Sequence, residues 1–208
     1  MKAFIITPFL TESIKNIVHI EKNDLVLCAD VAYLAAKKEG IEPNIIIGDF
    51  DHGENDAPQK STAEFIRVPS EKDDTDTMLC VKCALEKGAD EIVIVGGIGG
   101  RLDHTFANLQ TLAYIEMHGA HGRLLSEDNE AFLVGGKTVI PKRIGWYLSV
   151  FAYDRACTGV SIKGTKYEVS DVSLDTHFPL GVSNEITADA AIVSVKNGIL
   201  LVILSKKD

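Results

Sequence analysis

The strongest constraint in the sequence is an alternation of short apolar runs and helical patterns over the first two-thirds of the chain. The apolar runs are rich in β-branched residues and lack polar–apolar alternation, as expected of strands buried on both faces. We predict six such strands, at residues 3–6, 24–29, 44–47, 65–68, 91–95 and 122–125. Helices are predicted between them, at residues 31–38, 75–87 and 102–118. This order indicates a three-layer α/β domain, with a parallel sheet and helices on both faces.

The last third of the chain has a different pattern. After about Asn129 the helical periodicity is lost, and short apolar segments recur between turn residues. Strands are predicted at residues 131–134, 147–152, 160–162, 167–169, 190–195 and 199–203. The Asn197-Gly198 pair is a strong hairpin signal. We therefore predict two domains, an α/β domain of residues 1–128 and an antiparallel β-sandwich of residues 129–208.

The composition excludes several classes of protein. Lys and Arg number 21 against 30 Asp and Glu, giving a net charge of −9, so no nucleic-acid partner is expected. No apolar run reaches the ~20 residues of a membrane helix, and no signal peptide is evident. We expect a cytoplasmic protein with no membrane partner and reduced cysteines. The Cys80–Cys83 pair lacks a second pair of ligands with which to hold a structural zinc.

Acidic residues follow several of the predicted parallel strands. Asp30 ends the second strand, and Asp49 and Asp51 follow the third. Asp76 lies in the acidic segment after the fourth strand, and Asp103 lies beyond the fifth. Ligands of open parallel sheets bind at the carboxyl ends of the strands, and clustered carboxylates repel one another unless a cation lies among them. We therefore expect Mg²⁺ at this edge, where it would bridge carboxylates and phosphates.

Each of these carboxylates also has a purely structural interpretation. Asp30 could cap the helix that follows it, and one carboxylate of residues 73–74 could cap the next. Asp49 and Asp51 could be turn formers. Their spacing favours chelation, because a strand-like backbone would direct both carboxylates to one side and leave the intervening phenylalanine to pack.

A glycine-rich segment at residues 96–100, Gly-Gly-Ile-Gly-Gly, separates the fifth strand from the longest helix. It is not a Walker loop, since no Gly-Lys-Ser/Thr follows, and Leu102 occupies the third glycine position of a dinucleotide fingerprint. Glycines let the backbone approach a phosphate closely, and a helix N-terminus offers free N–H groups. Arg101 could bind phosphate oxygens bidentately. The segment thus predicts a phosphate site, the alternative being a tight turn with Arg101 in solvent.

Several motifs, in this order and spacing, resemble the thiamin pyrophosphokinase family. They are Gly-Asp-Phe-Asp at residues 48–51, Glu-Lys-Asp-Asp-Thr-Asp at 71–76, Gly-Gly-Arg-Leu-Asp-His at 99–104, Gly-Thr-Lys-Tyr at 164–167 and Gly-Val-Ser-Asn-Glu at 181–185. The resemblance covers about residues 24–203 and implies an ATP-binding α/β domain and a thiamin-binding β-sandwich. It further implies a homodimer with thiamin bound between subunits. Val31 and Tyr33 depart from a glycine-containing motif of the family, and His52 replaces its usual serine.

This resemblance implies that a pyrophosphoryl group passes from ATP to the hydroxyethyl oxygen of thiamin, with release of AMP. It assigns Mg²⁺ to Asp49, Asp51 and Asp76, with Asp30 and Asp103 near the ion or the nucleophile. Arg101 would hold the triphosphate and stabilise the transition-state charge. The ATP-binding residues that it implies are Gly97, Gly99, Gly100, Arg101 and His104. The thiamin-binding residues that it implies are Asp30, Ser183 and Asn184. An aromatic face beside the positive thiazolium ring would be favourable, and Trp146, Tyr147 and Phe178 are candidates for it, the alternative for each being a core or strand-pairing role.

Two further hypotheses remain open from the sequence. The altered segment after Asp30 is compatible with a thiamin- or nucleotide-binding sensor that has lost turnover. The carboxylates and glycine loop would equally suit a Mg²⁺-dependent kinase or pyrophosphokinase acting on another small alcohol.

Overall fold

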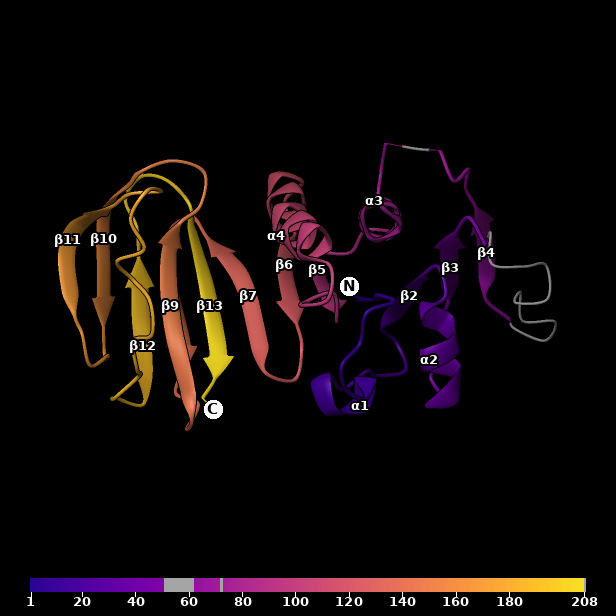
Figure 1. Cartoon of the computed structure of the whole chain (residues 1–208), viewed down its shortest axis with the longest axis horizontal. Coiled ribbons are helices and arrows are strands. Elements are labelled where there is room, and N and C mark those ends of the chain that lie inside the picture. The colour runs from indigo at the N-terminus through magenta and orange to yellow at the C-terminus, as the bar shows by residue number, and fades with distance from the viewer. Residues whose placement is uncertain (51–61, 72, 208) are drawn as a thin grey trace. The chain divides into compact units, whose positions relative to one another are not determined.

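The computed structural model describes residues 1–50, 62–71 and 73–207. The chain divides into two compact units, Met1–Glu127 and Asp128–Asp208 (Figure 1). Helices occur in the first unit, whereas the described part of the second unit is built of strands and connecting turns.

The first unit contains a six-stranded sheet in which every pair of neighbouring strands is parallel. Its order is β4-β3-β2-β1-β5-β6. These strands are β1 (Lys2–Ile6), β2 (Leu25–Ala29), β3 (Ile45–Gly48), β4 (Glu64–Arg67), β5 (Glu91–Val95) and β6 (His121–Leu125). The central strands are almost wholly buried, which confirms the parallel sheet predicted from their unalternating apolar runs.

Helices cover both faces of this sheet (Figure 1). They are α1 (Ile14–Ile17), α2 (Ala32–Lys38), α3 (Asp76–Glu86) and α4 (Leu102–Met117). Residues of α1 and α2 share a core cluster with Phe4 and Ile6 of β1. On the other face α4 packs on β6, where Gly122 gives it room, because a Cβ there would lie 3.0 Å from Ile115. The three helices predicted from the sequence are confirmed within a residue or two of each end.

The second unit is an antiparallel β-sandwich, as predicted. One sheet has the order β7-β13-β9, with β7 (Asn129–Val134), β13 (Leu200–Lys206) and β9 (Trp146–Ala152). The other has the order β11-β10-β12-β8, with β11 (Val169–Leu174), β10 (Cys157–Lys163), β12 (Ala190–Ser194) and β8 (Lys137–Pro141). Leu148 and Val202 of one sheet and Val160 and Val193 of the other belong to one buried core.

Two strands of this sandwich differ from the sequence prediction. Strand β8 was not expected, and β11 begins at Val169, where the predicted strand ended. The pairing of β10 with β11 contains register shifts, and Asp171 of β11 has a left-handed backbone with φ +55°. These irregularities break the two-residue period by which a strand is recognised in a sequence.

None of the helices in the described ranges is both long and apolar enough to cross a membrane.

Candidate functional site

The ends of β2 and β3 bring two of the predicted site residues to neighbouring positions. The Asp30 N–H donates to the Ile47 carbonyl at 2.7 Å, and Asp30 has a left-handed backbone with φ +46°. Gly48 lies against it, because a Cβ on Gly48 would be 2.8 Å from the Asp30 Cα and 2.9 Å from its Oδ1. The glycine therefore leaves space for the Asp30 carboxylate, directly before Asp49.

The backbone after β3 is not extended in the way that the predicted alignment of Asp49 and Asp51 requires. Phe50 has φ +52°, so the chain is left-handed there and not strand-like. Strand alternation thus cannot align the Asp49 and Asp51 carboxylates, and Asp51 and His52 lie outside the described residues. The phenylalanine does pack as expected, since its ring centroid lies 6.0 Å from that of Phe65.

In the acidic segment before α3, the residue that caps the helix is a threonine and not one of the carboxylates. Thr75 caps α3, because its Oγ1 accepts the Met78 N–H at 3.1 Å. The expectation that Asp73 or Asp74 might cap this helix is therefore wrong, and Asp74 instead pairs with Lys82 at 2.6 Å. Asp76 lies in the first turn of α3 with its Oδ1 buried.

The glycine-rich segment between β5 and α4 is called the glycine loop below. Four of its residues, Gly96, Gly97, Gly99 and Gly100, have φ between +63° and +96°. An L side chain is strained in this region, so glycines fit at all four positions. Three N–H groups of the loop already donate within the protein. That of Gly96 donates to the Leu125 carbonyl, that of Gly97 to the Phe9 carbonyl, and that of Gly99 to the Thr105 Oγ1.

Two side chains of α4 also form hydrogen bonds with the backbone of the glycine loop. Asn108 is buried and its Nδ2 donates to the Gly97 carbonyl at 2.9 Å. Thr105 accepts the Gly99 N–H at 3.0 Å. Neither residue was singled out in the sequence, although their positions four and seven residues beyond Arg101 place them on the loop side of the first helical turns.

Arg101 and Asp103 form a two-point ion pair at the start of α4. The Arg101 Nε lies 3.2 Å from Asp103 Oδ1, and Nη2 lies 2.6 Å from Oδ2. Both side chains are exposed, and the hydrogen bonds from Arg101 lower the pKa of Asp103. The exposed His104 contributes its main-chain N–H to Asp103 Oδ1. Arg101 is therefore exposed to solvent, as the tight-turn alternative expects, but its guanidinium is held by Asp103.

The described residues contain no group of three or more His, Cys, Asp or Glu side chains placed to hold a metal ion. Asp30, Asp49 and Asp76 are all described, whereas Asp51 is not. The side chains themselves suit a hard cation, because they are carboxylates at the ends of strands and a helix. Asp30 and Asp76 each have one buried carboxylate oxygen.

In the β-sandwich unit, Ser183 and Asn184 have different surroundings. Ser183 is exposed, and its backbone is left-handed with φ +57°. Asn184 is buried, and its side chain makes four hydrogen bonds. Its Oδ1 accepts the N–H groups of Tyr167 and Glu185, while its Nδ2 donates to the Tyr167 carbonyl and the Thr165 Oγ1. These bonds use both donor hydrogens and both acceptor positions of the amide, so Asn184 has a structural role here.

The three aromatic candidates also differ. The Trp146 ring has the Arg143 Cζ at 5.2 Å, and the Tyr147 ring has the Lys207 Nζ at 4.9 Å. Both rings thus already face a cation of the protein. Phe178 is 66% exposed and so offers an open ring.

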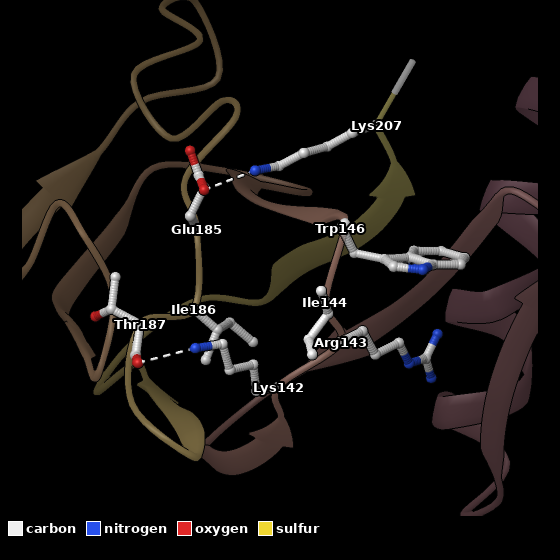
Figure 2. A pocket seen from close by; sticks show the side chains of 9 residues that line it. Lys142, Arg143, Ile144, Trp146, Glu185, Ile186, Thr187 and Lys207 are labelled. Carbon is white, nitrogen blue, oxygen red and sulfur yellow. Dashed lines mark hydrogen bonds and ion pairs between the residues drawn. The ribbon is translucent and has the colours of Figure 1, made fainter.

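A cavity of about 330 Å³ lies beside Trp146 (Figure 2). The Lys207 Nζ lies 2.6 Å from a Glu185 carboxylate oxygen, and the Lys142 Nζ donates to the Thr187 carbonyl at 3.1 Å. Figure 2 draws both contacts as dashed lines. Arg143 also lines the cavity and pairs with the buried Glu130. Three cationic side chains against one lining carboxylate disfavour a cationic ligand such as a thiazolium ring.

The fold is that of an α/β protein whose parallel sheet is followed in sequence by an antiparallel β-sandwich. Two family models match the sequence of the chain. One is the thiamin pyrophosphokinase catalytic domain, over residues 18–121, and the other is the thiamin pyrophosphokinase vitamin B1 binding domain, over residues 137–200. The chain belongs to the thiamin pyrophosphokinase family, which confirms the resemblance seen in its motifs.

Individual relatives agree with this assignment. The thiamine pyrophosphokinase of Bacillus subtilis (strain 168) is 28% identical over 192 residues, covering 90% of each chain. Thiamin pyrophosphokinase 1 of Caenorhabditis elegans is 25% identical over 170 residues, covering 76% of this chain and 68% of its own. Among solved structures, the Bacillus subtilis thiamine pyrophosphokinase superposes with a TM-score of 0.88 at 24% identity, and an Enterococcus faecalis thiamin pyrophosphokinase family protein with 0.86 at 25%. Both alignments cover the whole of both chains.

Proposed function

We propose that this chain transfers the pyrophosphoryl group of ATP to the hydroxyl of thiamin, giving thiamin diphosphate and AMP. The observation that carries the proposal is the match of the two family models, one within each structural unit. In this reaction the thiamin oxygen forms a bond to the β-phosphorus of ATP. The bond from that phosphorus to the oxygen bridging to the α-phosphate breaks, and the hydroxyl proton is released.

The α/β unit would bind the triphosphate. The glycine loop is preformed, and its Gly96, Gly97 and Gly99 N–H groups are already engaged. Phosphate would therefore be met by the N–H groups from Gly100 onward into the first turn of α4, where the helix dipole is positive. Arg101 would turn from Asp103 toward the phosphates and stabilise the charge that develops on them. His104, in the same first turn, would lie near the nucleotide.

We assign the metal ligands to Asp49, Asp51 and Asp76, with Asp30 and Asp103 nearby. Their carboxylate oxygens fit Mg²⁺, which when bound would supply charge neutralisation for the phosphates. Asp30, held against Gly48, would orient its carboxylate toward the substrate hydroxyl at the same sheet edge.

The β-sandwich unit would bind thiamin at Ser183. Beside it, Phe178, Leu180 and Val182 are 66%, 60% and 49% exposed. Such exposed apolar side chains support an interface with a second copy of the chain, with thiamin bound between subunits. Asn184 would hold the segment in place, and Phe178 is the aromatic ring best exposed to meet the thiazolium. We place the protein in the cytoplasm, which agrees with the four free cysteines of the described chain.

A direct assay tests the proposal. The purified chain is incubated with thiamin, ATP and Mg²⁺, and the products are separated by chromatography. Equal amounts of AMP and thiamin diphosphate are expected, and chelation of the metal should abolish both. Formation of ADP with thiamin monophosphate would contradict the proposal in favour of single-phosphate transfer. Binding of both substrates without product would contradict it in favour of a sensor.

A further inference from the structure

Phe9 is joined to the glycine loop by both its backbone and its side chain. It follows β1, and its carbonyl accepts the Gly97 N–H at 2.8 Å. Its ring lies directly against the loop. A Cβ built on Gly100 would be 2.6 Å from the Phe9 Cε2, and one on Gly99 would be 3.2 Å from its Cε1. The ring therefore occupies the space that side chains at residues 99 and 100 would need.

The ring is not an ordinary core side chain. Phe9 is 40% exposed, whereas Phe4 of the preceding strand is 1% exposed and lies in the core. Its contribution to burial is correspondingly small. What it fills is the space beside the last two glycines before the N–H groups of Arg101 and Leu102.

The other contacts of the loop fix its earlier part. Asn108 holds the Gly97 carbonyl, and Thr105 holds the Gly99 N–H. The Phe9 ring packs beside Gly100 and restricts the space around it. Gly100 has φ +63°, and as a glycine it is free to change its backbone torsions if the ring is removed. The direction of the next N–H groups depends on this torsion.

We propose that Phe9 is a positioning residue for the nucleotide phosphates, acting by setting the backbone of Gly99 and Gly100. The inference rests on the proposed function, because it requires phosphate to bind at the start of α4. A group misplaced by about 1 Å can cost up to about a hundredfold in rate, so a small shift in these N–H groups would be measurable.

The test compares Phe9→Ala, Phe9→Leu, Gly100→Ala and the double variant Phe9→Ala/Gly100→Ala. Gly40→Ala is the matched control, since Gly40 has φ +69° but a Cβ there meets nothing within 4 Å. It bears the same backbone strain without the steric contact. For each protein the dissociation constant of ATP is measured by calorimetry without thiamin, together with the KM of each substrate and the melting temperature.

Phe9→Ala is expected to raise the dissociation constant and KM of ATP about tenfold, with the KM of thiamin and the melting temperature near those of the wild type. Phe9→Leu should restore part of the affinity. Gly100→Ala should lose more ATP affinity than Gly40→Ala, and the double variant should bind ATP better than Gly100→Ala alone. An unchanged ATP affinity in Phe9→Ala, or a double variant no better than Gly100→Ala, would overturn the inference. A wild type that binds ATP but forms no thiamin diphosphate would refute the proposed function and leave this inference open to the binding test.

Discussion

Asp30 and Gly48 lie side by side at the ends of β2 and β3, with 2.8 Å between the Asp30 Cα and the position that a Cβ would take on Gly48. Gly48→Ala must therefore displace backbone at the strand edge, since the nearest atom is not the end of a flexible side chain. We expect it to lower kcat/KM by about a hundredfold or more and to reduce stability. Gly135→Ala, where a Cβ meets nothing within 4 Å, should match the wild type. Steady-state kinetics and thermal unfolding measure both effects, and full activity of Gly48→Ala would remove this edge from the site.

Arg101 offers a test that separates catalysis from stability. Its pair with Asp103 is exposed, and such pairs contribute little to folding. Arg101→Ala should therefore leave the melting temperature almost unchanged while lowering kcat/KM by about 10²–10³-fold. It should also raise the pKa of Asp103, because hydrogen bonds from Arg101 lower it in the wild type. Arg155→Ala is the matched control, since Arg155 is an equally exposed arginine beside an aspartate. Equal loss of activity in the two variants would argue against a specific role for Arg101.

Asn184 and Ser183 are neighbours for which opposite effects are expected. Asn184→Ala removes four hydrogen bonds from a buried position and should cost about 2 kcal/mol or more in unfolding free energy. Asn197→Ala, which removes one exposed side-chain bond to Thr158, is its control. Ser183→Ala should keep the stability and raise the KM of thiamin. Ser183→Gly should be more stable than Ser183→Ala, because glycine accepts φ +57° without strain. A stable Asn184→Ala with weakened thiamin binding would instead make Asn184 a direct ligand.

The sequence predicts the fold better than it predicts the contacts within the site. Buried β-branched runs and the helical patterns between them are local signals, and they predict the parallel strands and three helices. The short α1 was not predicted. The carboxylate of Glu39, from the end of α2, accepts the N–H groups of Ile14 and Lys15 and so caps it. Because this capping residue is distant in sequence, the four residues of the helix carry no local signal that predicts it.

The sequence predicts which residue types lie in the candidate site, but it does not predict their backbone geometry. The spacing of Asp49 and Asp51 predicts chelation only for an extended backbone, and the backbone at Phe50 is left-handed. The glycine loop was visible in the sequence, whereas its contact with Phe9 depends on the pairing of β1 with β5. Such contacts follow from tertiary structure, which one chain's residue pattern does not encode locally.

Glu185 is expected to respond to the removal of Lys207. In the wild type the hydrogen bond from Lys207, 2.6 Å away, lowers the pKa of Glu185 below its ordinary value of 4.5, with smaller help from the charge of Lys166. Lys207→Met should raise this pKa toward 4.5, and Lys166→Met should raise it less, because Lys166 lies 3.9 Å away. Carbon-detected NMR titration of the Glu185 carboxyl measures both.

The sign of the pH dependence follows from that shift. A carboxylate whose pKa is lower in the folded protein stabilises the fold above its unfolded pKa. Its contribution is lost as the pH falls through the lower, folded value. On acidification below about pH 5, Lys207→Met should therefore lose less stability than the wild type. An identical Glu185 titration in wild type and Lys207→Met would show that the ion pair is absent in solution.

Glu130 on β7 is 2% exposed at its side chain and pairs with Arg143, whose side chain is 41% exposed. Arg143→Met leaves the carboxylate in its buried position without this cation, so we expect a loss of about 2–3 kcal/mol, less than for a fully buried pair because the arginine is half in water. Glu130→Gln/Arg143→Met removes both charges and should recover most of that loss. Part of the loss could come from the Trp146 ring, which faces the same guanidinium at 5.2 Å. Glu130→Gln with Arg143 retained separates the two, since it keeps the ring contact and removes the ion pair. Urea unfolding of the four proteins closes the cycle, and additive effects would show that Glu130 and Arg143 are not coupled.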